Sequence, residues 1–152
     1  MTAGHGGDEP RLQMSSDRAV RLARLALLGT AWVFVACLAV QLFLVGLDVF
    51  GSLGGSGEEA GIHREFAYVY GWLAPLMVLL AAMGRLPRGR LLGAVALLVL
   101  FAVQTYLPTL ADGAPLLAAV HSVNAIAVVW LAVSLALAAR LELVRQPDLS
   151  GG

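Results

Sequence analysis

Four long apolar runs, separated by short polar stretches, divide most of the chain. An α-helix needs about 20 apolar residues to cross the hydrocarbon core of a bilayer, and each run reaches that length. The pattern therefore predicts four transmembrane helices, at about residues 18–47, 56–84, 90–110 and 115–140.

The predicted helices form one membrane domain over residues 18–140, with a tail at each end. Residues 1–17 are polar and rich in glycine, which is typical of a disordered tail, and residues 141–152 form a short C-terminal tail. Short connections make consecutive helices antiparallel. The fold class that we expect is all-α, an up-down-up-down four-helix transmembrane bundle.

Arginine positions predict how the bundle is oriented. Nine of the ten basic residues lie in the N-terminal segment up to residue 24, in the turn at residues 85–90, or at the C-terminal end from residue 140 onward, and only Arg64 lies on the other side. Arginines favour the cytoplasmic side of a membrane. Both termini and the turn at residues 85–90 are therefore predicted to be cytoplasmic, in a multi-pass protein of the cell's inner (plasma) membrane.

Composition supports a membrane protein. Hydrophobic residues make up 59% of the chain and charged residues 13%, against about 25% charged residues in soluble domains. The formal net charge is zero, which argues against nucleic acid as a partner. The lipid bilayer is the expected partner, with a redox partner or a second copy of the chain as further candidates.

Aromatic residues and a proline mark the second helix. Tyr68, Tyr70 and Trp72 fit a belt of aromatic side chains near the outer membrane surface, as does Tyr106 on the third helix. Pro75 removes a backbone donor inside the second helix and predicts a kink there.

Each predicted helix carries a polar side chain among its apolar residues. These residues lie near the outer helix ends, three of them about 9 Å below the end. Lipid cannot satisfy such groups, so they usually face the bundle interior. The sequence therefore predicts a polar layer in the outer half of the bundle, made by Gln41, His63, Gln104, His121 and Asn124.

Small residues accompany the two histidines along their helix faces. Small side chains allow close helix packing, but they also leave room for a flat ligand between the second and fourth helices. The residues that share a face with one histidine or the other are Ala67, Tyr70, Ala74, Met77, Ala114, Ala118, Ala125, Val128 and Ala132.

Two histidines on separate helices of a bundle suggest a b-type haem. His63 and His121 are the candidate axial ligands of the haem iron. Glu59, four residues before His63, is a candidate for orienting that ring. The hydrogen-bonding partners expected around the cofactor are Gln41, Gln104 and Asn124. The protein would then be a small electron-transfer cytochrome.

Two other functions remain open. The polar layer is equally consistent with a non-enzymatic membrane accessory or assembly protein, in which it only holds the helices together. It also fits binding of a quinone or another lipid-like ligand. We assign no catalytic residue, and an enzyme is not favoured, because the sequence contains no catalytic-triad order or phosphate-binding loop. The absence of a C-x-x-C-H motif excludes a covalently attached c-type haem.

Four stretches resemble a family of small bacterial four-helix membrane proteins of unknown function. They are "VFVACLAVQLFLVGLDVF", "HREFAYVYGWL", the glutamine of "FAVQTYL", and "VHSVNAIAVVWLA". The family's fourth helix usually carries His-Pro-x-Asn, whereas Ser122 stands at the proline position here. The resemblance implies the four-span fold and no function. Histidine placement is also similar to cytochrome b-type bundles, at the level of architecture.

Overall fold

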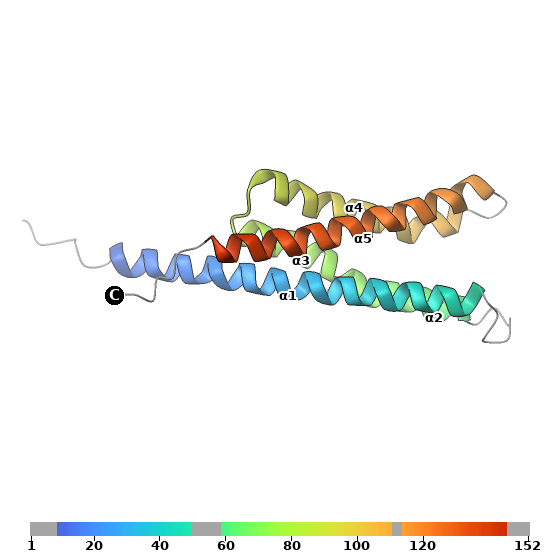
Figure 1. Ribbon diagram of the computed structural model, residues 1–152, viewed down its shortest axis with the longest axis horizontal. Helices are drawn as coiled ribbons and strands as arrows, with labels where there is room; N and C mark the ends of the chain where they lie inside the picture. The colour runs from blue at the N-terminus through green and yellow to red at the C-terminus, as the bar shows by residue number, and fades with distance from the viewer. Residues whose placement is uncertain (1–8, 50–58, 111–113, 146–152) are drawn as a thin grey trace, which may run out of the picture.

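The computed structural model describes residues 9–49, 59–110 and 114–145, which are almost entirely helical and contain no strand. Figure 1 shows long helices lying side by side. In chain order they are α1 (Glu9–Val49), α2 (Glu59–Gly71), α3 (Leu73–Met83), α4 (Arg88–Leu110) and α5 (Pro115–Val144).

These helices make four spans that are long and apolar enough to cross a membrane, because α2 and α3 together form the second span. The spans are Gln13–Leu47, Ile62–Met83, Arg88–Pro108 and Ala119–Val144. The predicted all-α four-helix bundle is therefore confirmed, and the chain is a multi-pass membrane protein.

Two helices extend beyond their predicted ends. α1 begins at Glu9, so residues 9–17 are helical and not part of a disordered tail. Pro10 lies in the first turn, where its missing N–H removes no helical hydrogen bond, and the residues that follow include good helix formers. α5 likewise continues to Val144. Residues 1–8 and 146–152, the rest of the predicted tails, lie outside the described residues, as does the predicted helix start at residues 56–58.

Pro75 accounts for the division between α2 and α3. α2 ends at Gly71, four residues before the proline, and α3 starts at Leu73. Pro75 has no N–H to donate to the Gly71 carbonyl, and its ring crowds that carbonyl. The interruption is confined to Trp72, which keeps right-handed helical angles (φ −63°, ψ −17°). The predicted kink is thus confirmed, and the second span is a bent helix.

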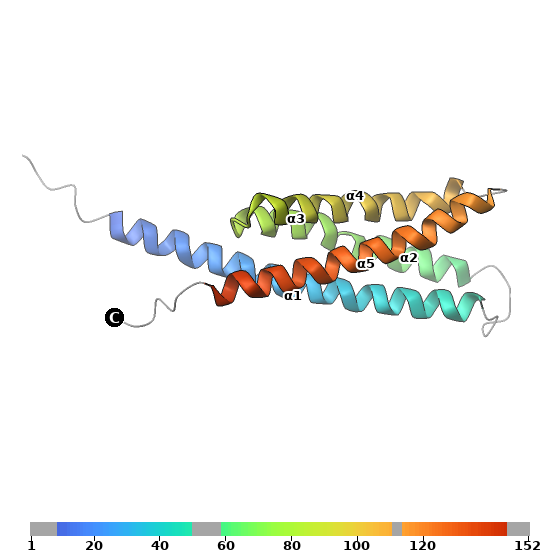
Figure 2. The same cartoon turned by 45° about the horizontal axis from the view of Figure 1, so that its top comes forward.

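The order of the spans around the bundle follows from their contacts. α5 packs against α1 and α4, and the bent α2–α3 span packs against α1 and α4 on the other side. Within the described residues, α5 makes no close backbone approach to α2 or α3. The second and fourth spans are therefore diagonal, an arrangement that can be followed in Figures 1 and 2.

An aromatic cluster fills the middle of the bundle. The rings of Phe34, Tyr70 and Phe101, from three different spans, meet edge to face with centroids 5.3–5.4 Å apart, and Phe66 lies against Tyr70. Tyr70 is only 5% exposed. Its expected place in the outer aromatic belt is therefore wrong, because the face it shares with Ala67 and Ala74 points inward.

Alanines line the remaining helix contacts and allow the backbones to approach closely. The alanines with no exposed surface are Ala31, Ala74, Ala81, Ala94, Ala132, Ala136 and Ala139.

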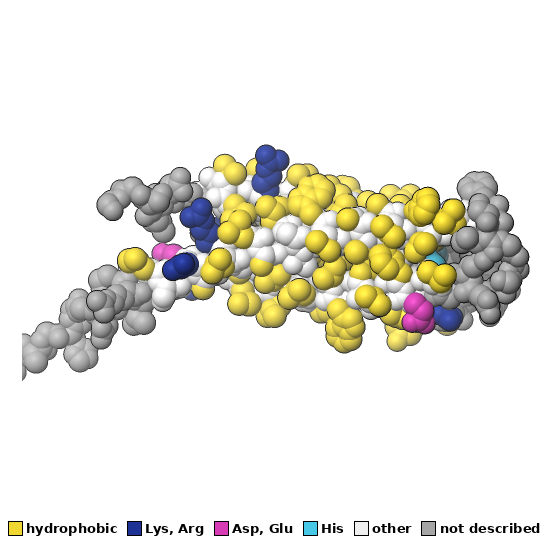
Figure 3. Space-filling model, turned by 90° about the horizontal axis from the view of Figure 1, so that it is seen from below, with side chains coloured by type: hydrophobic (Ala, Val, Ile, Leu, Met, Phe, Trp, Pro, Cys, Tyr) yellow, Lys and Arg dark blue, Asp and Glu magenta, His cyan; other side chains and the backbone are white. Residues whose placement is uncertain are grey.

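The outer surface of the bundle is apolar. In Figure 3, hydrophobic side chains cover the length of the visible face, and charged side chains gather toward its two ends. Tyr68, Trp72 and Tyr106 are 52–78% exposed, as expected for belt residues. A surface of this kind is stable in lipid, where exposed apolar side chains carry no hydration penalty.

Hydrogen bonds from Arg24 join three spans at the arginine-rich end. Its Nε donates to the carbonyl of Gly84 at 2.8 Å, and its Nη1 donates to the carbonyl of Glu142 at 3.2 Å. Gly84 follows α3, and Glu142 lies in the last turn of α5. Carbonyls at helix ends lack intrahelical partners, so the guanidinium on α1 satisfies two of them.

Candidate functional site

The structure brings the predicted polar residues together as two separate groups, one on each side of the bundle. The first group joins Gln41 of α1 to His63 of α2. Gln41 Nε2 lies 2.8 Å from His63 Nδ1 and 3.3 Å from His63 Nε2, and it donates to the His63 carbonyl oxygen at 3.1 Å. The amide thus contacts both the ring and the backbone of one histidine.

The second group joins α4 to α5. Asn124 Nδ2 donates to the Leu100 carbonyl at 2.9 Å and to Gln104 Oε1 at 2.7 Å. Gln104 Nε2 lies 3.0 Å from His121 Nε2. The three polar side chains form a chain of hydrogen bonds that starts at a backbone carbonyl and ends at an imidazole.

The Leu100 carbonyl determines the direction of every hydrogen bond in this second group. A carbonyl only accepts, so the Asn124 atom that faces it is the NH₂ group. That NH₂ also faces Gln104, which must present its oxygen, and the Gln104 NH₂ is left to donate to His121 Nε2. His121 is therefore a neutral ring that accepts at Nε2 and carries its proton at Nδ1.

The same reasoning orients the first group. The His63 carbonyl oxygen only accepts, so the Gln41 atom facing it is the NH₂ group. The second N–H of that group points to His63 Nδ1, which then acts as an acceptor. Gln41 Oε1 consequently faces away from the histidine.

Two buried polar atoms in these groups have no hydrogen-bond partner among the described residues. They are Nδ1 of His121 and Oε1 of Gln41. The first is a donor by the orientation derived above, and the second is an acceptor. Leaving such an atom unpaired in an apolar interior costs about 1–3 kcal/mol, so one unmatched donor and one unmatched acceptor at the same end of the bundle require an explanation.

Both groups lie between the aromatic cluster and the helix ends opposite Arg24. Gln41 follows Phe34 by seven residues, and His63 precedes Tyr70 by seven, which is about 10 Å along a helix. Gln104 follows Phe101 by three residues, or about 5 Å. The ring cluster therefore lies on the Arg24 side of both groups.

Each histidine ring is turned to the glutamine of a neighbouring span, His63 to Gln41 and His121 to Gln104. They lie on the diagonal α2 and α5. Among the residues that the structure describes, no three His, Cys, Asp or Glu side chains are grouped to hold a metal ion. Glu59 is the first residue of α2, and its side chain lies outside the described set.

Sequence reasoning missed a cavity of about 220 Å³ near the arginine-rich end, between α4 and α5. Its lining residues are Gly89, Arg90, Gly93, Trp130, Leu131, Ser134 and Leu135. The feature of the sequence that relates to this cavity is the spacing of Gly89 and Gly93 by one helical turn. That spacing does not indicate a cavity unless the helix that faces the two glycines is known.

Comparison with protein families finds a match over part of the chain. Residues 41–110 match a model described as a family of unknown function (DUF6220). The matched segment contains Gln41, His63 and Gln104, and it ends before His121 and Asn124. The match fits an uncharacterised family. Neither the curated proteins nor the solved structures yielded a match to this chain.

Proposed function

We propose that the outer polar layer binds the head group of a lipid-soluble molecule that can both accept and donate a hydrogen bond, as a quinone–quinol pair does. The observation that carries the proposal is the pair of buried unpartnered atoms, one donor and one acceptor. The protein is then a ligand-binding membrane protein with no residue assigned to bond-making chemistry.

The Nδ1–H group of His121 is suited to donate a hydrogen bond to a carbonyl oxygen of the ligand. Because Gln104 donates to His121 Nε2, the proton on Nδ1 is available to an acceptor from outside the chain. A quinone carbonyl is an uncharged acceptor, so it meets this N–H without bringing a charge into the membrane interior. Asn124 and the Leu100 carbonyl hold the hydrogen-bond chain in one direction, which keeps that proton on Nδ1.

The Oε1 atom of Gln41 is suited to accept a hydrogen bond from a hydroxyl group of the ligand. Gln41 Oε1 faces away from His63 because the amide NH₂ is engaged there, and it accepts no hydrogen bond from the described residues. A quinol hydroxyl would donate to it. Apolar residues and the aromatic rings below the layer suit the planar head group of such a molecule.

Haem b is the second candidate. The observation that favours it is the position of His63 and His121 on diagonal spans, at the same end of the bundle. Iron takes the lone pair of an unprotonated ring nitrogen, whereas Nε2 of His121 accepts from Gln104 and Nδ1 carries the proton. Haem ligation through Nε2 therefore requires His121 to release Gln104; a bound haem would supply one-electron transfer.

The test is purification of the full chain in detergent from quinone-containing cells, followed by solvent extraction and mass spectrometry. We expect about one quinone per chain in the wild type, loss of the quinone in His121→Phe and Gln41→Leu, and retention in Ser122→Ala. Ser122 is adjacent to His121 and exposed, which makes it the matched control.

A visible spectrum of the same sample separates the candidates. A Soret band that disappears in both His63→Ala and His121→Ala would overturn the quinone proposal in favour of haem. A wild-type protein that carries neither quinone nor haem would leave the polar layer with a purely structural role, as in an accessory or assembly protein.

A further inference from the structure

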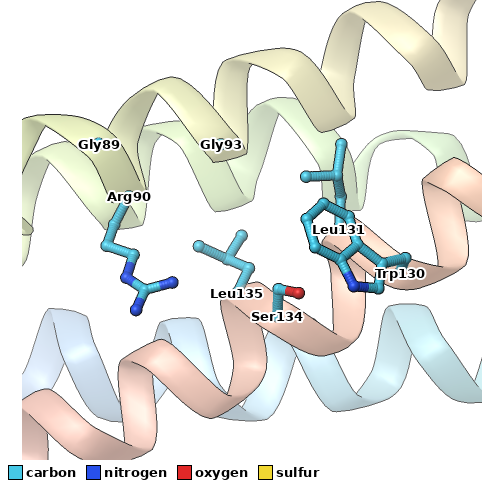
Figure 4. A pocket seen from close by; sticks show the side chains of 7 residues that line it. All are labelled: Gly89, Arg90, Gly93, Trp130, Leu131, Ser134 and Leu135. Atoms are coloured by element: carbon cyan, nitrogen blue, oxygen red, sulfur yellow. The ribbon is translucent and has the colours of Figure 1, made fainter.

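The cavity between α4 and α5 is polar at one end and apolar at the other. Arg90, the third residue of α4, lies at the arginine-rich end of the bundle. Figure 4 shows its side chain extending from α4 toward α5, with Ser134 and Trp130 on the facing helix. Leu131 and Leu135 complete the apolar part of the lining.

The glycines of this cavity border open space. A Cβ atom at Gly89 or Gly93 would meet no heavy atom within 4 Å, so no neighbouring side chain requires a glycine at either residue. A glycine inside a helix costs about 0.5–1 kcal/mol relative to alanine. The space they leave is therefore not used by packing within the chain.

Arg90 is exposed, and no acidic side chain in the described part of the chain lies within ion-pair distance of it. The ion pair that the described residues form joins Arg145 to Glu142. An unpaired guanidinium at a membrane surface attracts the anionic groups of lipids, and basic pockets between transmembrane helices bind such head groups.

We propose that this cavity holds an anionic phospholipid, with its phosphate on Arg90 and part of an acyl chain along Gly93, Leu131 and Trp130. Ser134 and Trp130 are one turn apart, about 6 Å along the helix, so Ser134 lies between the charged end and the indole. This order of charge, hydroxyl and apolar surface follows the order of groups in a phospholipid.

The size of the cavity supports an acyl-chain occupant. Sites that enclose a whole small molecule measure about 300–1,000 Å³, and this cavity holds about 220 Å³. Only part of a ligand is enclosed, as expected for a lipid whose remainder lies in the bilayer. Trp130 is 67% exposed and borders the bilayer at the apolar end.

The experiment is native mass spectrometry of the full chain released from nanodiscs that contain equal amounts of phosphatidylglycerol and phosphatidylcholine. We expect the wild type to retain phosphatidylglycerol preferentially. Arg90→Gln should lower that preference about five-fold, because it removes the guanidinium that lines the cavity and would hold the phosphate. Gly93→Leu, which fills the cavity, should reduce retention of both lipids.

Arg88→Gln is the matched control. It removes the same charge two residues earlier in the helix, and the Arg88 side chain does not line the cavity. It should keep the wild-type preference. Three results would overturn the proposal: no preference in the wild type, an equal loss in Arg88→Gln, or displacement of the lipid by inorganic phosphate alone. Each variant's helical content, measured by circular dichroism, shows that it is folded.

Discussion

Gly71 packs directly against the ring of Phe101, so that a Cβ atom at residue 71 would lie 2.9 Å from Cε1 of that ring. Phe101 is 6% exposed and meets Phe34 and Tyr70 edge to face. The ring therefore has no open space into which it can turn. This contact joins α2 of the second span to α4 of the third span.

Gly71→Ala should destabilise the protein. Overpacking a filled core costs about 1–3 kcal/mol, which exceeds the 0.5–1 kcal/mol that alanine gains over glycine in a helix. Gly29→Ala is the control, because a Cβ atom there meets nothing within 4 Å. Thermal unfolding in detergent should show a lower Tm for Gly71→Ala and an unchanged or higher Tm for Gly29→Ala; equal values would contradict the contact.

Asn124 and Gln104 should be energetically coupled. Replacing Asn124 with leucine leaves Gln104 Oε1 without its donor, and replacing Gln104 removes the acceptor of Asn124. A double-mutant cycle of Asn124→Leu and Gln104→Leu should give a coupling of about 0.6–1.7 kcal/mol, the range for hydrogen bonds between membrane helices. Strictly additive effects in an unfolding titration would refute the hydrogen bond.

Arg24→Lys should weaken the arginine-rich end of the bundle by about 1.5 kcal/mol. A lysine keeps the charge but lacks the planar group that reaches the carbonyls of Gly84 and Glu142 together. Arg21→Lys, one turn earlier and exposed, is the control. Detergent unfolding should separate the two variants, and equal stability would show that the two hydrogen bonds contribute nothing.

Arg85→Gly should stabilise the fold by about 1 kcal/mol. Arg85 has a positive φ of 51° and directly follows Gly84, the C-cap of α3. Here the Leu86 N–H donates to the Ala81 carbonyl and the Arg85 N–H donates to the Ala82 carbonyl. These are the bonds of a Schellman helix end, whose left-handed residue is normally glycine. Arg88→Gly removes the same charge without relieving a left-handed residue, and unfolding measurements should show no gain for it.

The predicted orientation can be tested with single cysteines in a Cys37→Ala background. Glu65→Cys should react with a membrane-impermeant maleimide on intact cells, because the arginine distribution places this end outside. Arg145→Cys should react only after permeabilisation. The reverse labelling pattern would show that the bundle is inserted the other way round.

Much of the fold could be predicted because it depends on local properties of the chain. The length of each apolar run defines a span, and Pro75 alone accounts for the bend at Trp72. The inward face of the second helix was also predictable from spacing, since Ala67, Ala74 and Met77 are buried. These features require no knowledge of which helices are neighbours.

The pairing of the polar residues could not be predicted in the same way. The sequence identified Gln41, His63, Gln104, His121 and Asn124 as one layer, but not which histidine each glutamine contacts. That choice depends on the order of the helices around the bundle and on their rotation, which short turns leave open. The orientation of His121 depends further on a backbone carbonyl, at Leu100, which no residue pattern reveals.

The guanidinium of Arg24 has a consequence for biosynthesis. One of its acceptors lies in the last turn of the last helix, 118 residues later in the chain, and the first helix packs along the last. The first span therefore enters the membrane long before its main neighbour has been synthesised. Until α5 arrives, the face of α1 that packs against α5 must be covered by lipid or by another protein of the membrane, and a chain that stops short of α5 cannot close the bundle.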